Sequence, residues 1–166
     1  IAVRPGQTIT AKGYDDVEFL ISTNPGESLK PLSQVASGGE LSRIMLAIKT
    51  VLAGRDEIDT LIFDEIDTGI SGRTAWKVAE QLSVLSGAHQ VICITHLPQI
   101  AAMADVHFVI EKSSTDDMTI TDIQKVTDEE SLAELARLLG SDALTEAALS
   151  NAKEMKEQAN AFKEAR

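Results

Sequence analysis

Cysteine is almost missing from this sequence of 166 residues, and its single occurrence excludes an internal disulfide. That residue, Cys93, stands inside the apolar run QVICITH, which predicts a small buried hydrophobic side chain. No apolar run approaches the roughly 18 residues needed to span a bilayer, and no basic region followed by an apolar one stands near the N-terminus. We therefore expect a cytoplasmic protein that is neither inserted into a membrane nor secreted.

Positive charge is also scarce. Lys and Arg number 15 against 26 Asp and Glu, the net charge is −11, and no cluster of basic residues stands out. Such a surface repels the backbone of a nucleic acid, so any contact with DNA is expected from other parts of a longer protein or from a partner. The chain begins at Ile1 without a methionine, from which we expect a piece of a longer polypeptide.

The order of the apolar runs predicts an α/β fold. Unbroken apolar strands at 60–63 (TLIF) and 90–95 (QVICIT) alternate with helices expected at 37–53, 73–86 and 98–104. Such strands favour a mostly parallel sheet flanked by helices on both faces. Antiparallel hairpins are expected at the sheet edge, from runs at 7–13 and 15–23 joined by a turn at 13–16, and at 106–112 and 118–126. Thr127 and Glu130 predict a capping box before a helix that ends at Gly140, and Ser141 is expected to begin a longer helix.

The stretch VASGGELSRIMLAIK, residues 35–49, places two glycines at the start of an amphipathic helix. Ser37 and Glu40 match a capping box, which accounts for those two residues and for neither glycine. Gly38 and Gly39 are unfavourable inside a helix by about 1 kcal/mol each relative to alanine. Bare backbone at the positive end of a helix lets amides approach an anion such as phosphate. A simple helix start and a phosphate contact both stay open at this point.

Charged and polar side chains end two neighbouring strands. TLIF is followed by Asp64 and Glu65, and VICIT is followed by His96. Ligands bind at the carboxyl ends of parallel strands, so these side chains are expected at one edge of the sheet. Asp64 suits Mg²⁺ and Glu65 suits the orientation of an attacking water, although an acidic pair also commonly just ends a strand. His89 and His107 lack such a placement and are interpreted as structural.

The loop that normally cradles nucleotide phosphates, G-x-x-x-x-G-K-[ST], is absent from the sequence. The nearest match, GISGRT at 69–74, has its glycines three residues apart and an arginine in place of the lysine. A nucleotide site in this chain would therefore need another polypeptide segment.

Four motifs in this order resemble the ATP-binding-cassette superfamily, in its SMC-like branch. SGGE resembles the signature motif, TLIFDE the Walker B strand with the catalytic glutamate, DTGIS the D-loop and ITH the switch histidine. DDVEFLISTNPGE and THLPQIAAMAD bring the sequence closer still to DNA repair members of that branch, over residues 14–112 and more weakly beyond. The sequence departs from the usual motifs at Ala36, where leucine is usual, at Glu40, where glutamine is usual, and at Ser71, where many D-loops carry aspartate.

The resemblance implies the C-terminal lobe of an ATPase head with a P-loop NTPase fold. Residues 1–166 would form one domain, with edge strands in 1–30, the motif-bearing core in 31–112, and an edge strand with C-terminal helices in 113–166. The N-terminal lobe, which carries Walker A, would lie elsewhere in the protein beyond a long coiled coil. This piece alone is expected to be inactive.

The resemblance also implies ATP and Mg²⁺ as cofactors and assigns a role to each motif. The catalytic residues would be Glu65 and His96, and Asp64 would be the Mg²⁺ ligand. The signature residues, which would bind the ATP of an opposing head, are Ser37, Gly38, Gly39 and Glu40. The D-loop would contribute Asp67, Gly69 and Ser71 to the nucleotide site. The implied partners are the N-terminal lobe, a second head in an ATP-sandwich homodimer, and DNA reached through other parts of a nucleoid-associated protein. Two alternatives stay open: a different cassette ATPase, such as the nucleotide-binding subunit of a transporter, and a non-catalytic docking module.

Overall fold

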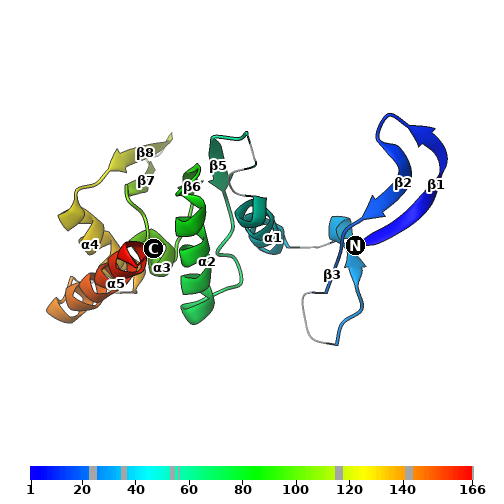
Figure 1. Cartoon of the computed structure of the whole chain (residues 1–166). Helices are drawn as coiled ribbons and strands as arrows, with labels where there is room; N and C mark the ends of the chain where they lie inside the picture. The colour runs from blue at the N-terminus through cyan, green and yellow to red at the C-terminus, as the bar shows by residue number, and fades with distance from the viewer. Residues whose placement is uncertain are drawn as a thin grey trace.

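The structure, a computed structural model, describes residues 1–22, 26–34, 37–52, 55, 57–114, 118–140 and 144–165. Helices and strands alternate through the middle of the chain, which confirms the α/β class (Figure 1). The elements are β1 Ala2–Thr10, β2 Gly13–Glu18, β3 Leu20–Ile21, β4 Lys30–Pro31, a 3-10 helix at Leu32–Gln34, α1 Gly38–Leu52, β5 Thr60–Phe63, α2 Gly72–Leu85, β6 Gln90–Cys93, α3 Pro98–Ala102, β7 Phe108–Ser114, β8 Thr119–Lys125, α4 Asp128–Leu138 and α5 Glu146–Glu164.

The expectation of a mostly parallel sheet is wrong for the residues that the structure describes. They form four two-stranded sheets, of which β5–β6 is parallel and β1–β2, β3–β4 and β7–β8 are antiparallel. Only two apolar runs are separated by a crossover helix, and the other strands pair with a close neighbour in sequence, which gives antiparallel hairpins. Of these four sheets, the parallel pair β5–β6 is therefore the one that positions the candidate site.

The β5–β6 pair is covered on one face. Phe63 is buried, and Leu61, Val91 and Cys93 pack against the core. The opposite face carries Ile62, which is 68% exposed, and two further isoleucines, Ile92 and Ile94, that are 45% and 48% exposed. A parallel sheet normally has both faces buried, whereas this apolar face is exposed in the described part of the chain.

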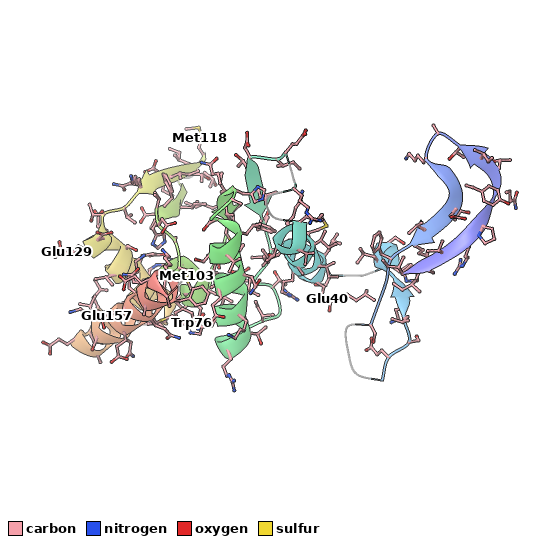
Figure 2. All side chains as sticks on the ribbon, in the orientation of Figure 1. Glu40, Trp76, Met103, Met118, Glu129 and Glu157 are labelled. Carbon is pink, nitrogen blue, oxygen red and sulfur yellow. The ribbon has the colours of Figure 1, made fainter. Side chains whose placement is uncertain are left out.

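The hydrophobic core lies between the helices and the inner face of β5–β6. Its largest fully buried side chains are Ile66, Leu85 and Leu135, from the loop after β5, from α2 and from α4. Trp76 of α2 packs against this core (Figure 2). Among the described residues no helix is both long enough and apolar enough to cross a membrane.

The N-terminal hairpin is confirmed, with three corrections. Its turn falls at Ala11 and Lys12, where Thr10 pairs with Gly13, instead of at 13–16, and Phe19 separates β2 from β3. The hairpin is also a sheet of its own and not the edge of a larger one, and it lies at the opposite end of the molecule from α4 and α5 (Figure 1). Gly13 adopts a φ of 108°, which glycine alone tolerates readily, and so fixes the turn.

The C-terminal helices begin where their capping residues allow. Thr127 and Glu130 form the predicted capping box on α4, in which the Glu130 carboxylate accepts the Thr127 amide at 2.8 Å. That backbone hydrogen bond is the main reason why the pKa of Glu130 is lowered. The next helix begins at Glu146 with Thr145 as its N-cap, later than predicted. Ser141 itself lies outside the described residues.

Candidate functional site

The first turn of α1 lies directly against the loop that follows β5. A side chain at Gly38 would collide with the carboxylate of Glu65. A Cβ at the buried Gly39 would stand 2.8 Å from the carbonyl oxygen of Glu65, 2.9 Å from that of Thr68 and 3.0 Å from Arg43 Nη1. Within this chain, the two glycines therefore let the start of α1 lie close to the turn at residues 65–68. A phosphate contact by the same residues stays a prediction.

Two polar side chains of α1 fasten the helix to the same turn. Ser42 Oγ donates to the carbonyl oxygen of Asp64 at 2.9 Å. Arg43 Nη1 donates to the carbonyl oxygens of Ile66 at 3.0 Å and Thr68 at 2.9 Å. The helix α1 and the turn after β5 thus form one unit. The acceptors are main-chain carbonyl oxygens, so replacing the side chains of Asp64, Ile66 or Thr68 would not remove them.

Replacement of Arg43 with alanine should lower the free energy of unfolding by about 1.5 kcal/mol, because it removes two hydrogen bonds from a charged donor. Urea denaturation of the wild-type and variant chains measures this difference. Alanine at the exposed Arg73, in the first turn of α2, is the matched control and should change stability by less than about 0.5 kcal/mol. Equal stability of the Arg43 variant and the wild type would show that these bonds contribute nothing.

Glu65 has a strained backbone. Its φ of 57° makes it the one non-glycine residue with positive φ in the described part of the chain. This left-handed conformation costs a residue with a side chain about 1–2 kcal/mol. The turn is held by the Thr68 amide, which donates to the Glu65 carbonyl oxygen at 3.0 Å. Strain of this kind concentrates at functional positions, which makes Glu65 a candidate on geometry as well as on sequence.

Asp64 is exposed at the carboxyl end of β5 and suits a divalent cation. Its Oδ1 accepts the Glu65 amide at 2.9 Å, which orients the carboxylate. Mg²⁺ bound with a nucleotide takes one or two carboxylates and fills its remaining positions with phosphate oxygens and water. Three side chains grouped as a metal site are not found among the described residues. Asp64 therefore fits as a single protein ligand to nucleotide-bound Mg²⁺.

Asp67, predicted as a D-loop contributor to the nucleotide site, lies buried in the loop after β5. The side chain is only 4% exposed. Its Oδ2 accepts the Thr95 hydroxyl at 2.6 Å and the His96 amide at 2.8 Å, and it pairs with His96 Nδ1 at 2.9 Å. The His96 side chain is 72% exposed. The structure thus joins the predicted D-loop to His96, the predicted switch histidine, through a buried carboxylate.

The remaining predicted residues flank this centre. Ser37 precedes α1, where its carbonyl oxygen accepts the Leu41 amide at 3.0 Å, and Glu40 lies in the first helical turn (Figure 2). Gly69 adopts a φ of 75° in the loop between β5 and α2. Ser71 is the N-cap of α2, and its side chain makes no capping hydrogen bond. Their part in binding a nucleotide stays a prediction.

The electrostatic environment of the strand ends is negative. The pKa of Cys93 is raised to about 12, first by burial and then by the charges of Asp67 and Asp64. Cys93 is thus a neutral side chain that packs against the core, but it is half-buried instead of fully buried as predicted. The other two histidines are structural, as predicted: His89 is buried with Nδ1 2.7 Å from the Ile58 carbonyl oxygen, and His107 Nδ1 lies 2.9 Å from Ser131 Oγ.

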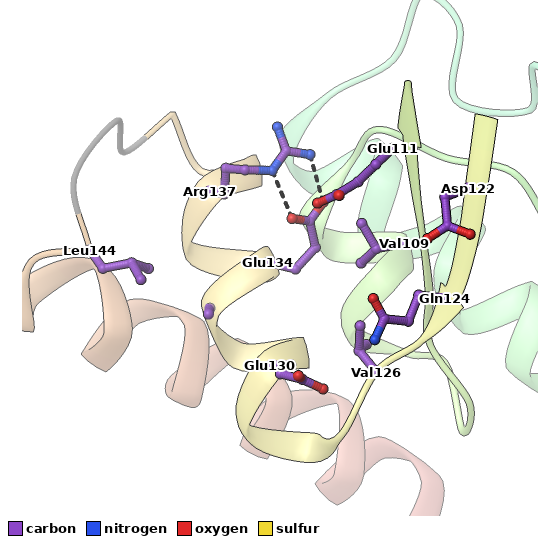
Figure 3. A pocket seen from close by; sticks show the side chains of 10 residues that line it. Val109, Glu111, Asp122, Gln124, Val126, Glu130, Glu134, Arg137 and Leu144 are labelled. Carbon is purple, nitrogen blue, oxygen red and sulfur yellow. Dashed lines mark hydrogen bonds and ion pairs between the residues drawn. The ribbon is translucent and has the colours of Figure 1, made fainter. Parts of the chain in front are cut away.

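Two surface cavities of the described residues lie elsewhere. One, of about 390 Å³, is formed mainly by β7, β8 and α4, and the other, of about 400 Å³, is lined by Ala104, Asp105 and residues of α4 and α5. In the first, Arg137 is already paired with Glu134 at 2.6 Å, and Glu111, Asp122 and Glu130 add negative charge (Figure 3). Neither cavity includes a candidate residue, and the acidic lining of the first opposes a triphosphate.

Three residues of the candidate site were not predicted from the sequence. Ser42 and Arg43 directly follow SGGEL on α1, and Thr95 directly precedes the switch histidine. The spacing of Gly39, Ser42 and Arg43 places them on one face of a helix, and this spacing could have indicated that they share a contact. The partners of that face lie more than twenty positions away in sequence, and no local pattern identifies them.

Comparison with known proteins gives consistent matches. The DNA repair protein RecN of Treponema pallidum is 54% identical over 143 residues, 86% of this chain and 25% of that protein. RecN of Bacillus subtilis is 48% identical over 155 residues, and RecN of Halalkalibacterium halodurans is 48% identical over 151 residues. No family model matches the chain.

A solved structure from work on the structural biochemistry of ATP-driven dimerization and DNA stimulated activation of SMC ATPases also matches. Its TM-score is 0.48 at 23% identity, over 75% of this chain and 81% of that chain. This chain spans about a quarter of the length of the RecN proteins that it matches: 27% of those of Bacillus subtilis and Halalkalibacterium halodurans and 25% of that of Treponema pallidum. The identities, near one residue in two over nine-tenths of the chain, make it a homologue of a segment of the DNA repair protein RecN.

Proposed function

We propose that this chain is the C-terminal lobe of the ATP-hydrolysing head of a RecN-type protein that acts in the repair of DNA double-strand breaks. The observation that carries the proposal is the strained Glu65, seated between the glycine-rich start of α1 and the end of β5. A helix start, an acidic strand end and an exposed histidine on one unit suit the binding and hydrolysis of a nucleoside triphosphate.

In this proposal each side chain has a separate task. Glu65 orients the attacking water and accepts its proton. Asp64 holds Mg²⁺, which neutralises the charge on the phosphates. His96 contacts the γ-phosphate. Ser37, Gly38 and Gly39 of a second head complete the pocket from the other side, so that ATP joins two heads until it is hydrolysed.

The partner that we propose for the open face of β5–β6 is the N-terminal lobe of the same protein. Ile62, Ile92 and Ile94 form an apolar surface on one side of a parallel pair, and such a pair requires cover on both sides. The N-terminal lobe would supply the phosphate-binding loop that this sequence lacks. Contact with DNA is assigned to other parts of the whole protein, in the cytoplasm and at the nucleoid, because this segment has a net charge of −11.

Complementation tests the proposal. We expect the chain alone to hydrolyse no ATP, and a mixture with the separately produced N-terminal segment of a RecN protein to do so. The variant Ile62→Asp should fail to associate and to activate, since a charge at a buried apolar interface is costly. The exposed Ile9 of β1 offers the matched control, Ile9→Asp, which should leave the activity of the mixture unchanged. A demonstrated complex without activity would favour a docking module instead.

A further inference from the structure

We infer that Asp67 is a positioning residue for the switch histidine, which it holds by Nδ1 so that Nε2 is the ring nitrogen presented to the nucleotide. This inference rests on the proposed function and deepens it. It moves Asp67 from the group of residues that would contact ATP to one that acts through His96.

The donors around Asp67 determine the tautomer. A carboxylate only accepts hydrogen bonds, and its Oδ2 lies 2.9 Å from His96 Nδ1. Nδ1 must therefore carry a proton, so that in the neutral ring Nε2 has none. The His96 main-chain amide donates to the same oxygen at 2.8 Å, and the two bonds together fix both the backbone and the ring of one residue.

The surroundings of Asp67 make this arrangement rigid. The carboxylate is 4% exposed, and the Thr95 hydroxyl donates to it at 2.6 Å while accepting the Leu97 amide at 3.0 Å. The histidine ring in contrast is 72% exposed. A buried, fully oriented acceptor beneath an exposed ring is the arrangement that directs the far nitrogen outward.

The loop connects this pair to the catalytic glutamate. Asp67 and Glu65 belong to the same turn, which Arg43 holds through the carbonyl oxygens of Ile66 and Thr68. A shift of the turn would therefore move Glu65 and His96 together. This gives the D-loop a function inside its own chain, in addition to any contact with a second head.

Nitrogen-15 NMR of the histidine rings tests the tautomer in the chain of residues 1–166. In the neutral state we expect His96 to carry its proton on Nδ1 in the wild type, and both tautomers to be populated in Asp67→Ala. Thr95→Val, which keeps the carboxylate, should retain the Nδ1 proton. His89 and His107 serve as internal controls for folding in every sample. A wild-type His96 protonated on Nε2, or an unchanged tautomer in a folded Asp67→Ala chain, would overturn the inference.

A double-mutant cycle in a full-length RecN protein that carries this segment tests the functional consequence. Misplacement of a catalytic group by about 1 Å can cost roughly 100-fold, so we expect Asp67→Ala to lower kcat by roughly 10- to 100-fold with little change in KM. The double variant with His96→Ala should be no slower than His96→Ala alone. Multiplicative losses would refute action through His96. Failure of the proposed ATPase function would instead show as unchanged turnover in a Glu65 variant, whatever the tautomer.

Discussion

Glutamine at position 65 should lower ATP turnover by about 100- to 10,000-fold in a full-length protein that carries this segment, because it removes a general base. The substitution keeps the size of the side chain and its place beside Gly38. ATP binding should persist, and heads joined by ATP should therefore stay together longer. Steady-state phosphate release measures turnover, and size-exclusion chromatography with ATP measures the lifetime of the dimer.

The matched control is Glu57→Gln. Glu57 is an exposed glutamate just before β5, at the opposite end of the strand from Glu65, and the change in charge is the same. Its turnover should equal that of the wild type. If the Glu65→Gln variant binds ATP and hydrolyses it at nearly the wild-type rate, Glu65 is not the catalytic base. The backbone strain at Glu65 would then have no catalytic explanation.

Local patterns predicted those parts of the fold that local forces determine. The apolar periodicity identified α1, α2 and the strand β5, and the Thr127 and Glu130 pair identified the start of α4, because each depends on residues within a few positions. The pairing of the strands was not predicted correctly. Apolar β5 and β6 were interpreted as the centre of a larger parallel sheet, yet only these two strands pair in that way here. The strands that a larger sheet needs are not encoded by the apolar runs of this segment.

The candidate site shows the same division. Asp64, Glu65 and His96 were predicted at strand ends from their position alone. The burial of Asp67 beneath His96 was not predictable, because the two residues are 29 positions apart and their contact depends on how β6 lies beside β5. The positive φ of Glu65 likewise follows from the packing of α1 against the turn, and no residue preference of glutamate announces it.

The glycine pair at the start of α1 gives the second large effect, and it separates two explanations of the same motif. A Cβ at Gly39 meets two main-chain carbonyl oxygens at 2.8 and 2.9 Å, which can move only with the whole turn. Gly39→Ala should therefore lower the free energy of unfolding by up to about 3 kcal/mol, the cost of overpacking a closed site. A Cβ at Gly38 meets the end of the Glu65 side chain, which can rotate away.

Gly38→Ala should thus be neutral or slightly stabilising, since alanine is the better helix former by about 1 kcal/mol. Urea denaturation of the two variant chains measures both values under the same conditions. ATP binding and hydrolysis in the full-length protein then distinguish the explanations. A stable Gly38→Ala variant that loses ATP binding requires the exposed glycine for the nucleotide, whereas one that binds ATP and loses turnover has only displaced the Glu65 carboxylate. If Gly38→Ala is stable and fully active, position 38 has no role in phosphate binding. Glycine at position 39 is then explained by its packing against the turn.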